Sequence, residues 1–511
     1  AFQGCPSLTS VTIGSGVTTI SASTFQDCAQ LPGITIPDNV TSIGASAFQG
    51  CPSLTSVTIG SGVTTISAST FKDCVKLPGI KIPDNVTSIG ASTFKGCTNL
   101  TSITIGSGVT TISASTFQGC TNLTSITIPD NVTSIDDSTI ENGAFQGCTS
   151  LTSVYIGSGS LLTSIGNYAF YICISLTSIT IPDNVTSIGD SAFFGCTSLT
   201  TVTFGSGSLL TSIGNYAFGS AQGLPSITIP KSVATIGEYA FQDCSSLTSI
   251  KIPDSVKTID VGAFQDCSSL TSIKIPDSVT SIGVGAFQDC TFLTSVTFNS
   301  GSLLTSIGAS TFYNCLFLTS VTIPNNVTSI GDSAFFGCPS LTTVTIGRGS
   351  LLTSIGNYAF QDCVKLPSIT IPKSVATIGE YAFQDCPRLT SVTFGNGSLL
   401  TSIGANAFQS CYALPSIKIP NNVTSIGDSA FFGCTSLTSV TIGSGVTSIG
   451  NYAFQDCTAL PSVTFLGRPP PVVGDDAFAQ LATNPIALVT KANQPIFGKV
   501  GTIWHGLIIT I

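Results

Sequence analysis

Short stretches of alternating apolar and hydroxyl residues recur along the whole chain. In the segment Leu54–Ile59, the apolar residues Val57 and Ile59 alternate with Ser56 and Thr58. A period of two is typical of a strand with one face buried and the other in solvent. A turn of the type Ile-Gly-Ser-Gly or Ile-Pro-Asp-Asn follows each stretch, where Gly permits positive φ and Pro fixes φ at roughly −65°. The pattern therefore predicts many short strands, each ended by its own turn.

The same unit repeats along the sequence. A phenylalanine marks each unit, at Phe2, Phe25, Phe48 and onward, mostly at spacings of 23 or 25 residues. Self-similarity at such a period is typical of a solenoid, in which each unit buries its apolar face against its neighbours. The longer units carry Gly-Ser-Leu-Leu-Thr-Ser-Ile-Gly in place of Gly-Val-Thr-Ser-Ile-Gly, and residues 135–144 hold a larger insertion. Insertions of this size are expected in surface turns.

These patterns define the predicted fold and its boundaries. We expect a β-rich solenoid of about twenty coils of 23–25 residues over residues 1–464, with a short 3₁₀ or α turn at each Ala-Phe segment. After Phe465 the repeat degrades through a Gly-Arg-Pro-Pro-Pro run and one last Ala-Phe pair. Residues 465–511 are therefore predicted to be a degenerate last repeat and a C-terminal cap.

All nineteen cysteines stand three residues after a phenylalanine, as Cys51 follows Phe48. They could form disulfides, bind metal or line the core. Stacked coils would place neighbouring cysteines about 4.8 Å apart with parallel Cα–Cβ bonds, whereas a disulfide needs Cβ atoms about 3.8 Å apart. The odd count, the lack of Cys-x-x-Cys and the single histidine remove the usual zinc sites. We predict buried free thiols beside a continuous spine of phenylalanine rings.

Composition excludes several classes of partner. Only 8% of residues are charged and the net charge is −9, so the chain lacks the basic surface that nucleic acid or anionic lipid requires. No apolar run approaches the roughly 18 residues of a membrane span. We expect no nucleic-acid partner and no membrane insertion in this segment. Because the sequence contains no Met, Ala1 is not the initiator, and the chain is processed or begins partway through a longer polypeptide.

Catalytic residues are not predicted. His505 is the only histidine and lies next to Trp504, the only tryptophan, in the final segment, so we expect a capping role for it. Carboxylates recur with the repeat and do not converge. We predict no enzymatic activity, no cofactor and no metal site. An aligned column of turn aspartates could bind a hard cation, but turn chemistry explains it adequately, because Asp after Pro suits a tight turn. The column consists of Asp38, Asp84, Asp130, Asp183, Asp254 and Asp277.

One repeat carries a family resemblance over its full length. Residues 176–196 read Leu-Thr-Ser-Ile-Thr-Ile-Pro-Asp-Asn-Val-Thr-Ser-Ile-Gly-Asp-Ser-Ala-Phe-Phe-Gly-Cys, which resembles the BspA-like class of leucine-rich repeats. The resemblance extends over residues 1 to about 464, and the closing segment is similar to that of such arrays. It implies a secreted or surface-displayed protein that attaches to host matrix or to other cells, without catalysis in the repeats. Ala221 in place of Cys, and Gly in place of Pro in many turns, depart from the class pattern.

Asparagine sequons of the form Asn-x-Ser/Thr are candidate glycosylation sites. Most belong to the repeat itself, through Asn-Val-Thr, so their number alone is weak evidence of modification. The candidates are Asn39, Asn85, Asn99, Asn122, Asn131, Asn184, Asn326, Asn396 and Asn422.

Outward-facing hydroxyl columns form the candidate binding face. They include Ser10, Thr12, Ser56, Thr58, Ser125, Thr127, Ser178 and Thr180. Three interpretations remain open: a solvated strand face, a broad surface for matrix protein or carbohydrate, and an ice-binding lattice. The lattice is disfavoured because Lys81, Lys251, Lys274 and Lys418 interrupt it.

Two functions remain open at this point. The first is an extracellular or cell-surface scaffold that mediates adhesion to a host or matrix protein or a glycan. The second is a structural filament subunit that stacks head to tail with copies of itself. The filament is suggested by the first coil, which begins at its Ala-Phe pair without a polar outer face, so that something is expected to cover residues 1 to about 30.

Overall fold

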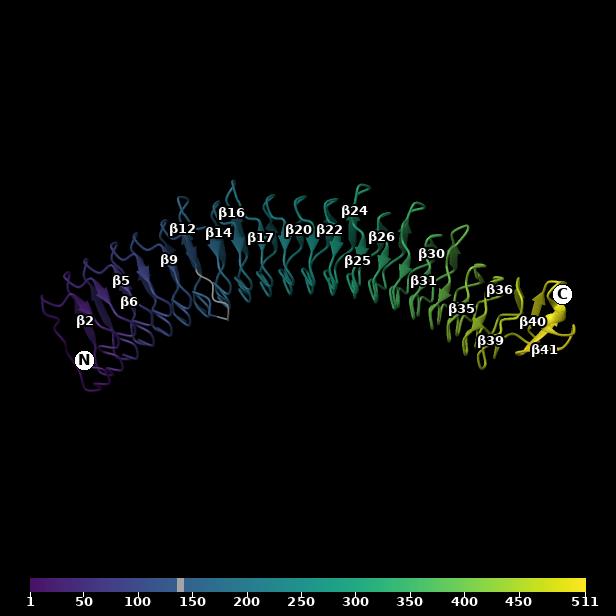
Figure 1. Ribbon diagram of the computed structural model, residues 1–511, viewed down its shortest axis with the longest axis horizontal. Coiled ribbons are helices and arrows are strands. Elements are labelled where there is room, and N and C mark those ends of the chain that lie inside the picture. The colour runs from purple at the N-terminus through teal and green to yellow at the C-terminus, as the bar shows by residue number, and fades with distance from the viewer. Residues whose placement is uncertain (136–141) are drawn as a thin grey trace. The chain divides into compact units, whose positions relative to one another are not determined.

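The computed structural model describes residues 1–135 and 142–511, and most of the larger insertion expected at 135–144 lies outside them. It divides into two compact units, Ala1–Val256 and Lys257–Ile511. Each unit is a stack of coils wound as a β-solenoid (Figure 1), and together they contain about 21 turns of roughly 23 residues. The predicted fold class is therefore confirmed.

The predicted alternating segments form long strands of three or four residues. Side chains alternate between core and solvent, as in Ser178–Ile181, where Ile179 and Ile181 are buried and Ser178 and Thr180 are exposed. The long strands of the first unit are β2 (Gly33–Ile36), β4 (Ser56–Ile59), β6 (Gly79–Lys81), β8 (Ser102–Thr104), β10 (Ser125–Ile128), β12 (Ser153–Ile156), β14 (Ser178–Ile181), β16 (Thr201–Phe204), β18 (Ser226–Thr228) and β20 (Ser249–Lys251). Those of the second unit are β22 (Ser272–Ile275), β24 (Ser295–Phe298), β26 (Ser320–Ile323), β28 (Thr343–Ile346), β30 (Ser368–Ile371), β32 (Ser391–Phe394), β34 (Ser416–Lys418), β36 (Ser439–Ile442), β38 (Ser462–Phe465) and β40 (Ile486–Val489).

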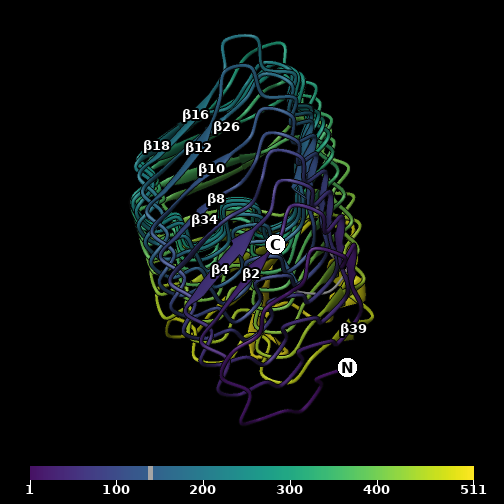
Figure 2. The same ribbon diagram turned by 90° about the vertical axis from the view of Figure 1, so that its left-hand side faces the viewer.

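A second column of two-residue strands lies on a different side of each coil (Figure 2), and the sequence pattern did not predict it. Within each unit these strands form an unbroken parallel ladder, as where Ile43 pairs with Ile20 and with Ile66. In the first unit they are β1 (Thr19–Ile20), β3 (Ser42–Ile43), β5 (Thr65–Ile66), β7 (Ser88–Ile89), β9 (Thr111–Ile112), β11 (Ser134–Ile135), β13 (Ser164–Ile165), β15 (Ser187–Ile188), β17 (Ser212–Ile213) and β19 (Thr235–Ile236). In the second they are β21 (Thr258–Ile259), β23 (Ser281–Ile282), β25 (Ser306–Ile307), β27 (Ser329–Ile330), β29 (Ser354–Ile355), β31 (Thr377–Ile378), β33 (Ser402–Ile403), β35 (Ser425–Ile426), β37 (Ser448–Ile449) and β39 (Val472–Val473).

The core between the strand columns follows the repeat. Phenylalanines of successive coils stack with ring centroids 5.0–5.6 Å apart, as Phe145 does on Phe170, which confirms the predicted spine. Eighteen of the nineteen cysteines are buried and all are free. Each Ala-Phe segment is a run of isolated i→i+3 turns, with hydrogen bonds such as that from Cys28 N to Phe25 O at 3.3 Å. A left-handed residue such as Ser46, at φ 56°, interrupts each run, so the expected 3₁₀ or α turn does not extend into regular helix within the described repeats.

Residues 465–511, called the closing segment below, continue the stack and then fold back. Strand β40 pairs in parallel with β38 and with β42 (Leu507–Thr510), and β41 (Ile503–Trp504) pairs antiparallel with β42 at the outer edge of the sheet. In sequence, α1 (Gln494–Phe497) lies between β40 and β41 and is the one α-helix in the described part of the chain. The rings of Phe465, Phe497 and Trp504 meet with centroids 5.1–5.3 Å apart and pack over the last coil.

Candidate binding surface

The predicted hydroxyl columns lie on the solvent face of the long strands. Ser56 and Thr58 on β4, and Ser178 and Thr180 on β14, are exposed. On β10, Thr127 is exposed and Ser125 is half-buried. Ser10 and Thr12 are exposed but belong to no strand, because the first coil forms none at that position.

Neighbouring coils hold the hydroxyls in parallel register where their strands pair. Thr58 lies beside Thr35, and Thr180 lies beside Thr203 with their Oγ1 atoms 2.9 Å apart. The register also places Thr127 beside Tyr155, and Thr297 beside Lys274. The face is therefore a hydroxyl array interrupted by an exposed tyrosine and by lysines.

The array is less continuous than the repeat predicts. Within the units the long strands fall into separate sheets, with breaks between β4 and β6, β8 and β10, β16 and β18, β28 and β30, and β32 and β34. The hydroxyl columns therefore lie on several shorter sheets and not on one continuous sheet.

Four of these breaks have a proline at the start of the second strand, although Pro461 at the same repeat position leaves β38 paired with β36. In most coils the residue after the repeat leucine is Thr, whose N–H donates to the coil before it. Thr200 N, for example, lies 2.9 Å from Thr177 O. In the second strand of those four pairs the residue is proline, which has no N–H to donate; these residues are Pro78, Pro225, Pro367 and Pro415. Each still accepts from the following coil, as Pro225 O does from Thr248 N at 3.0 Å. The break between β8 and β10 has no such proline.

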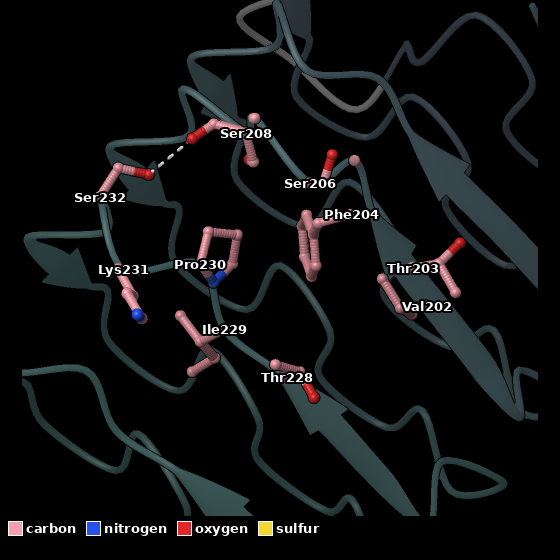
Figure 3. Close-up of a pocket in the computed structure, with 12 residues that line it drawn as sticks. Val202, Thr203, Phe204, Ser206, Ser208, Thr228, Ile229, Pro230, Lys231 and Ser232 are labelled. Atoms are coloured by element: carbon pink, nitrogen blue, oxygen red, sulfur yellow. Dashed lines mark hydrogen bonds between the residues drawn. The ribbon is translucent and has the colours of Figure 1, made fainter. Parts of the chain in front are cut away.

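Shallow grooves open at three of the proline breaks. They lie between β4 and β6, between β16 and β18 and between β32 and β34, with volumes of about 480, 740 and 540 Å³. In the second of these, Phe204 and Thr203 come from one coil, and Pro230 and Lys231 from the next (Figure 3). The other two grooves repeat the threonine, the apolar strand end and the proline, but their lysine, Lys81 or Lys418, lies on the strand two residues before the proline.

The turn aspartates bind backbone of the next coil. Asp38 Oδ1 accepts hydrogen bonds from Ser61 N at 2.7 Å and from Ser61 Oγ at 3.0 Å. The backbone N–H of Ser107, and then its hydroxyl, hold the pKa of Asp84 below its usual value. This geometry supports the turn interpretation of the column. No group of three or more His, Cys, Asp or Glu side chains in the described ranges could hold a metal ion.

The sequon asparagines fall into two groups. In six of them the side-chain Nδ2 donates to a carbonyl of the preceding coil; these are Asn39, Asn85, Asn131, Asn184, Asn326 and Asn422. Asn99, Asn122 and Asn396 are exposed, and no side-chain hydrogen bond is found for them among the described residues. The sequence motif alone does not separate the two groups, because the separation depends on contacts between coils.

The cysteine column is a ladder of hydrogen bonds as well as apolar packing. At least seventeen of the nineteen thiols donate to the carbonyl of the phenylalanine one coil earlier, as Cys51 does to Phe25 O and Cys363 to Phe335 O, with Sγ–O distances of 3.1–3.4 Å. Burial raises the pKa of Cys148 and Cys196 to about 12. His505 lies in the closing segment against Trp504, with ring centroids 4.8 Å apart.

Comparisons with known proteins agree with this geometry. A family described as BspA type Leucine rich repeat region (6 copies) matches residues 1–120, 64–141, 137–245, 211–342, 305–424 and 401–488. A leucine-rich repeat protein from Bacteroides ovatus is 31% identical, with a TM-score of 0.54 over 76% of this chain and 87% of that one. A leucine rich cell surface protein from Faecalibacterium prausnitzii is 28% identical, with a TM-score of 0.36 over 75% and 85% of the two chains.

No curated protein matches the sequence. Among the described residues, no helix is both long and apolar enough to cross a membrane. The family match covers almost all of the repeats and extends into the closing segment. The chain therefore belongs to the BspA-type leucine-rich repeat family.

Proposed function

We propose that this protein is a non-enzymatic scaffold of the cell surface or extracellular space that binds a matrix protein or a glycan along its long-strand face. The observation that carries the proposal is the recurrence of one groove at equivalent positions. Several equivalent sites along the coils suit a repetitive or extended partner, because each further contact forms at high effective concentration. The family, whose repeats typically serve as interaction scaffolds, supports the same function.

The groove chemistry narrows the partner. Each groove offers a threonine hydroxyl, a flat apolar strand end, a proline ring and a lysine ammonium group. Such a surface can accept hydrogen bonds from and donate them to hydroxyl groups, and its lysine attracts carboxylate or sulfate. We propose that the partner carries hydroxyl and acidic groups, as acidic glycans and acidic segments of matrix proteins do.

The test uses the full chain on immobilised matrix proteins and on a glycan array. The variant Thr58→Asp, Thr203→Asp, Thr393→Asp places one carboxylate in each groove, and we expect its binding to fall at least tenfold. The matched control is Ser198→Asp, Ser246→Asp, Ser436→Asp, which adds the same charge at exposed serines on the turn segments. Equal loss in the two variants, or no binding by the unaltered chain, would contradict the proposal.

Head-to-tail stacking into a filament is the alternative function. The closing segment argues against it, because β41 runs antiparallel and occupies the outer edge of the sheet on which a parallel coil would have to stack. Negative-stain electron microscopy of the unconcentrated protein separates the two functions. We expect isolated particles, and long fibres would establish the filament instead.

A further inference from the structure

Five aromatic side chains from four successive coils of the first unit touch one another in a continuous row. Tyr168 meets Tyr171 edge to face with centroids 5.5 Å apart, and Tyr171 stacks on Phe194 at 5.4 Å. Phe194 meets Tyr216 edge to face at 6.3 Å, and Tyr216 stacks on Tyr239 at 4.8 Å. We call this row the aromatic ridge. It lies on the turn segments that contain the Ala-Phe pairs, and not on the long strands that form the grooves.

Three of these tyrosines occupy an unfavourable backbone position. Tyr168, Tyr216 and Tyr239 have φ values of 56°, 54° and 55°, in the left-handed region that costs residues with a Cβ about 1–2 kcal/mol. Other coils fill the same position with small polar residues, such as Ser46 and Asn406, both at φ 56°. The backbone therefore does not require tyrosine at this position. The tyrosine rings instead contribute to the exposed surface of the ridge.

The ridge is a surface feature and not a part of the core. All five rings are half-buried, while the spine phenylalanines of the same coils are fully buried. Ser191, which lies in the coil between Tyr168 and Tyr216, is only 8% exposed, although the equivalent Ser46 and Ser333 are half-buried. The rings thus pack over the backbone between them and present one connected apolar surface with phenolic hydroxyls.

Carboxylates accompany the rings. Asp190 and Glu238 are exposed, and Asp190 Oδ1 accepts a hydrogen bond from Asn215 N at 2.7 Å, directly before Tyr216. Burial first, then Tyr239 and the charge of Glu238, raise the pKa of Tyr216. The four turn segments, residues 166–176, 189–199, 214–224 and 237–247, contain Asp190, Glu238 and Asp243 and no lysine or arginine.

We propose that the aromatic ridge docks a partner protein through lysine or arginine side chains of that partner. Aromatic rings attract cations through their π-electrons, and arginine also stacks on them. The adjacent carboxylates of Asp190 and Glu238 complement the same charge. Tyrosine and arginine dominate the energetic centres of protein interfaces. The ridge segments carry carboxylates and no lysine or arginine, whereas each groove carries a lysine, so we expect a different partner on the long-strand face. The test below does not depend on the grooves.

The second unit contains a variant of the ridge. Residues 313–386 closely repeat residues 171–244, and they stack Tyr313 on Phe336 at 4.9 Å and Tyr358 on Tyr381 at 4.8 Å. Lys365 and Arg388 stand there in place of Gly223 and Ser246. These cations reduce the negative charge of the second-unit copy, and we expect it to bind a basic partner more weakly.

The test measures binding of a fluorescent octa-arginine peptide to the full chain by anisotropy, with octa-glutamate as the comparison probe. The variant Tyr216→Asn, Tyr239→Asn removes two rings and keeps a residue that the same position accepts at Asn406. We expect arginine-peptide affinity to fall at least tenfold, with an unchanged circular dichroism spectrum. The charge variant Asp190→Asn, Glu238→Gln is expected to lower affinity at least threefold and to reduce its dependence on salt.

Tyr155→Thr provides the matched control. Tyr155 is 60% exposed on β12, in the same unit but on the long-strand face, so its loss should leave arginine-peptide binding unchanged. The proposal is overturned if the double asparagine variant binds as the unaltered chain does, or if Tyr155→Thr weakens binding equally. It is also overturned if the unaltered chain ignores octa-arginine and instead binds a neutral oligosaccharide through Tyr216 and Tyr239.

Discussion

The buried thiols stabilise the stack by hydrogen bonding between coils. Phe25 O accepts Cys28 N of its own coil at 3.3 Å and Cys51 Sγ of the next coil at 3.1 Å. The sequence indicated small apolar groups in the core, and the burial of these residues confirms that part. The donor role could not be predicted from the spacing, because the acceptor belongs to a different coil and depends on how the two coils align.

Ala221 provides a test of the thiol ladder, because it is the repeat position at which a cysteine is missing. Phe193 O lies one coil earlier and keeps its bond from Cys196 N at 3.2 Å, but no thiol follows it. We expect Ala221→Cys to raise the free energy of unfolding by about 0.5–1.5 kcal/mol, through added packing and one hydrogen bond. Urea unfolding under reducing conditions measures the change. A fall in stability, with all thiols still free, would contradict the ladder as a stabilising element.

Titration of the buried thiols is expected to lower the stability of the folded chain at high pH. Burial raises the pKa of Cys148, Cys196 and Cys338 to about 12 from an ordinary value of 9.0. At a pH between these two pKa values, the folded chain keeps thiol protons that the unfolded chain has lost. Rising pH therefore lowers the free energy of unfolding by up to about 1.4 kcal/mol per thiol and pH unit. We expect the urea concentration at the midpoint of unfolding to be constant below about pH 8.5 and to fall steadily above that pH.

The control for the pH effect is the double variant Cys148→Ala, Cys196→Ala. Removing two of the titrating groups should make the fall with pH shallower, even though the variant starts from a lower stability. A midpoint that stays constant up to pH 10.5, or a slope unchanged in the variant, would be inconsistent with thiol titration as the cause.

The two groups of sequon asparagines predict unequal glycosylation. A glycan on Asn184 would be attached to the same Nδ2 atom that donates a hydrogen bond to Ser160 O. The bulk of the glycan would therefore press on the neighbouring coil. Asn99, Asn122 and Asn396 carry no such constraint. When the chain is secreted from a host that glycosylates asparagine, we expect higher occupancy at these three sites. Mass spectrometry of glycopeptides measures it, with occupancy at Asn184 as the internal comparison.

At the scale of the element, the sequence predicted the long strands and missed the short ones. The long strands contain a full alternation of apolar and hydroxyl residues, whereas Ser42–Ile43 has only two residues and cannot display a period. The grooves were missed for a related reason. Pro225 carries no local sign of the break beside it, because the absent pairing involves the coil before it. The aromatic ridge likewise joins residues that lie a full coil apart in sequence.

Replacing one strand-start proline tests the origin of the breaks. Pro225→Thr restores an N–H that can donate to Thr200 O, as Thr248 N donates to Pro225 O. We expect β18 to pair with β16 and its amides to exchange at least tenfold more slowly in hydrogen–deuterium exchange. Stability is a poor measure here, because losing proline also frees the unfolded chain by up to about 1 kcal/mol. Unchanged exchange in β18 would show that the proline does not cause the break.

At the scale of the whole molecule, each coil contacts mainly the coils before and after it. Stability in such an array is close to a sum of coil and interface terms, so an end needs its own covering. We propose that the closing segment provides this covering, since β42 extends the sheet by a strand and β41 reverses direction at the edge. A parallel coil from another chain cannot continue that ladder in register, because the outermost strand runs the opposite way.

Removing the closing segment should therefore convert the protein into a self-associating one. Deletion of residues 466–511 uncovers Val463 and Phe465, both at most 1% exposed in the intact chain, and frees the edge of β38. We expect light scattering and sedimentation to show association that grows with protein concentration. Ile503→Ser is the control, because Ile503 is 74% exposed and its loss uncovers no core. If the shortened chain remained monomeric with unchanged thermal stability, the closing segment would not be the element that protects this end of the stack.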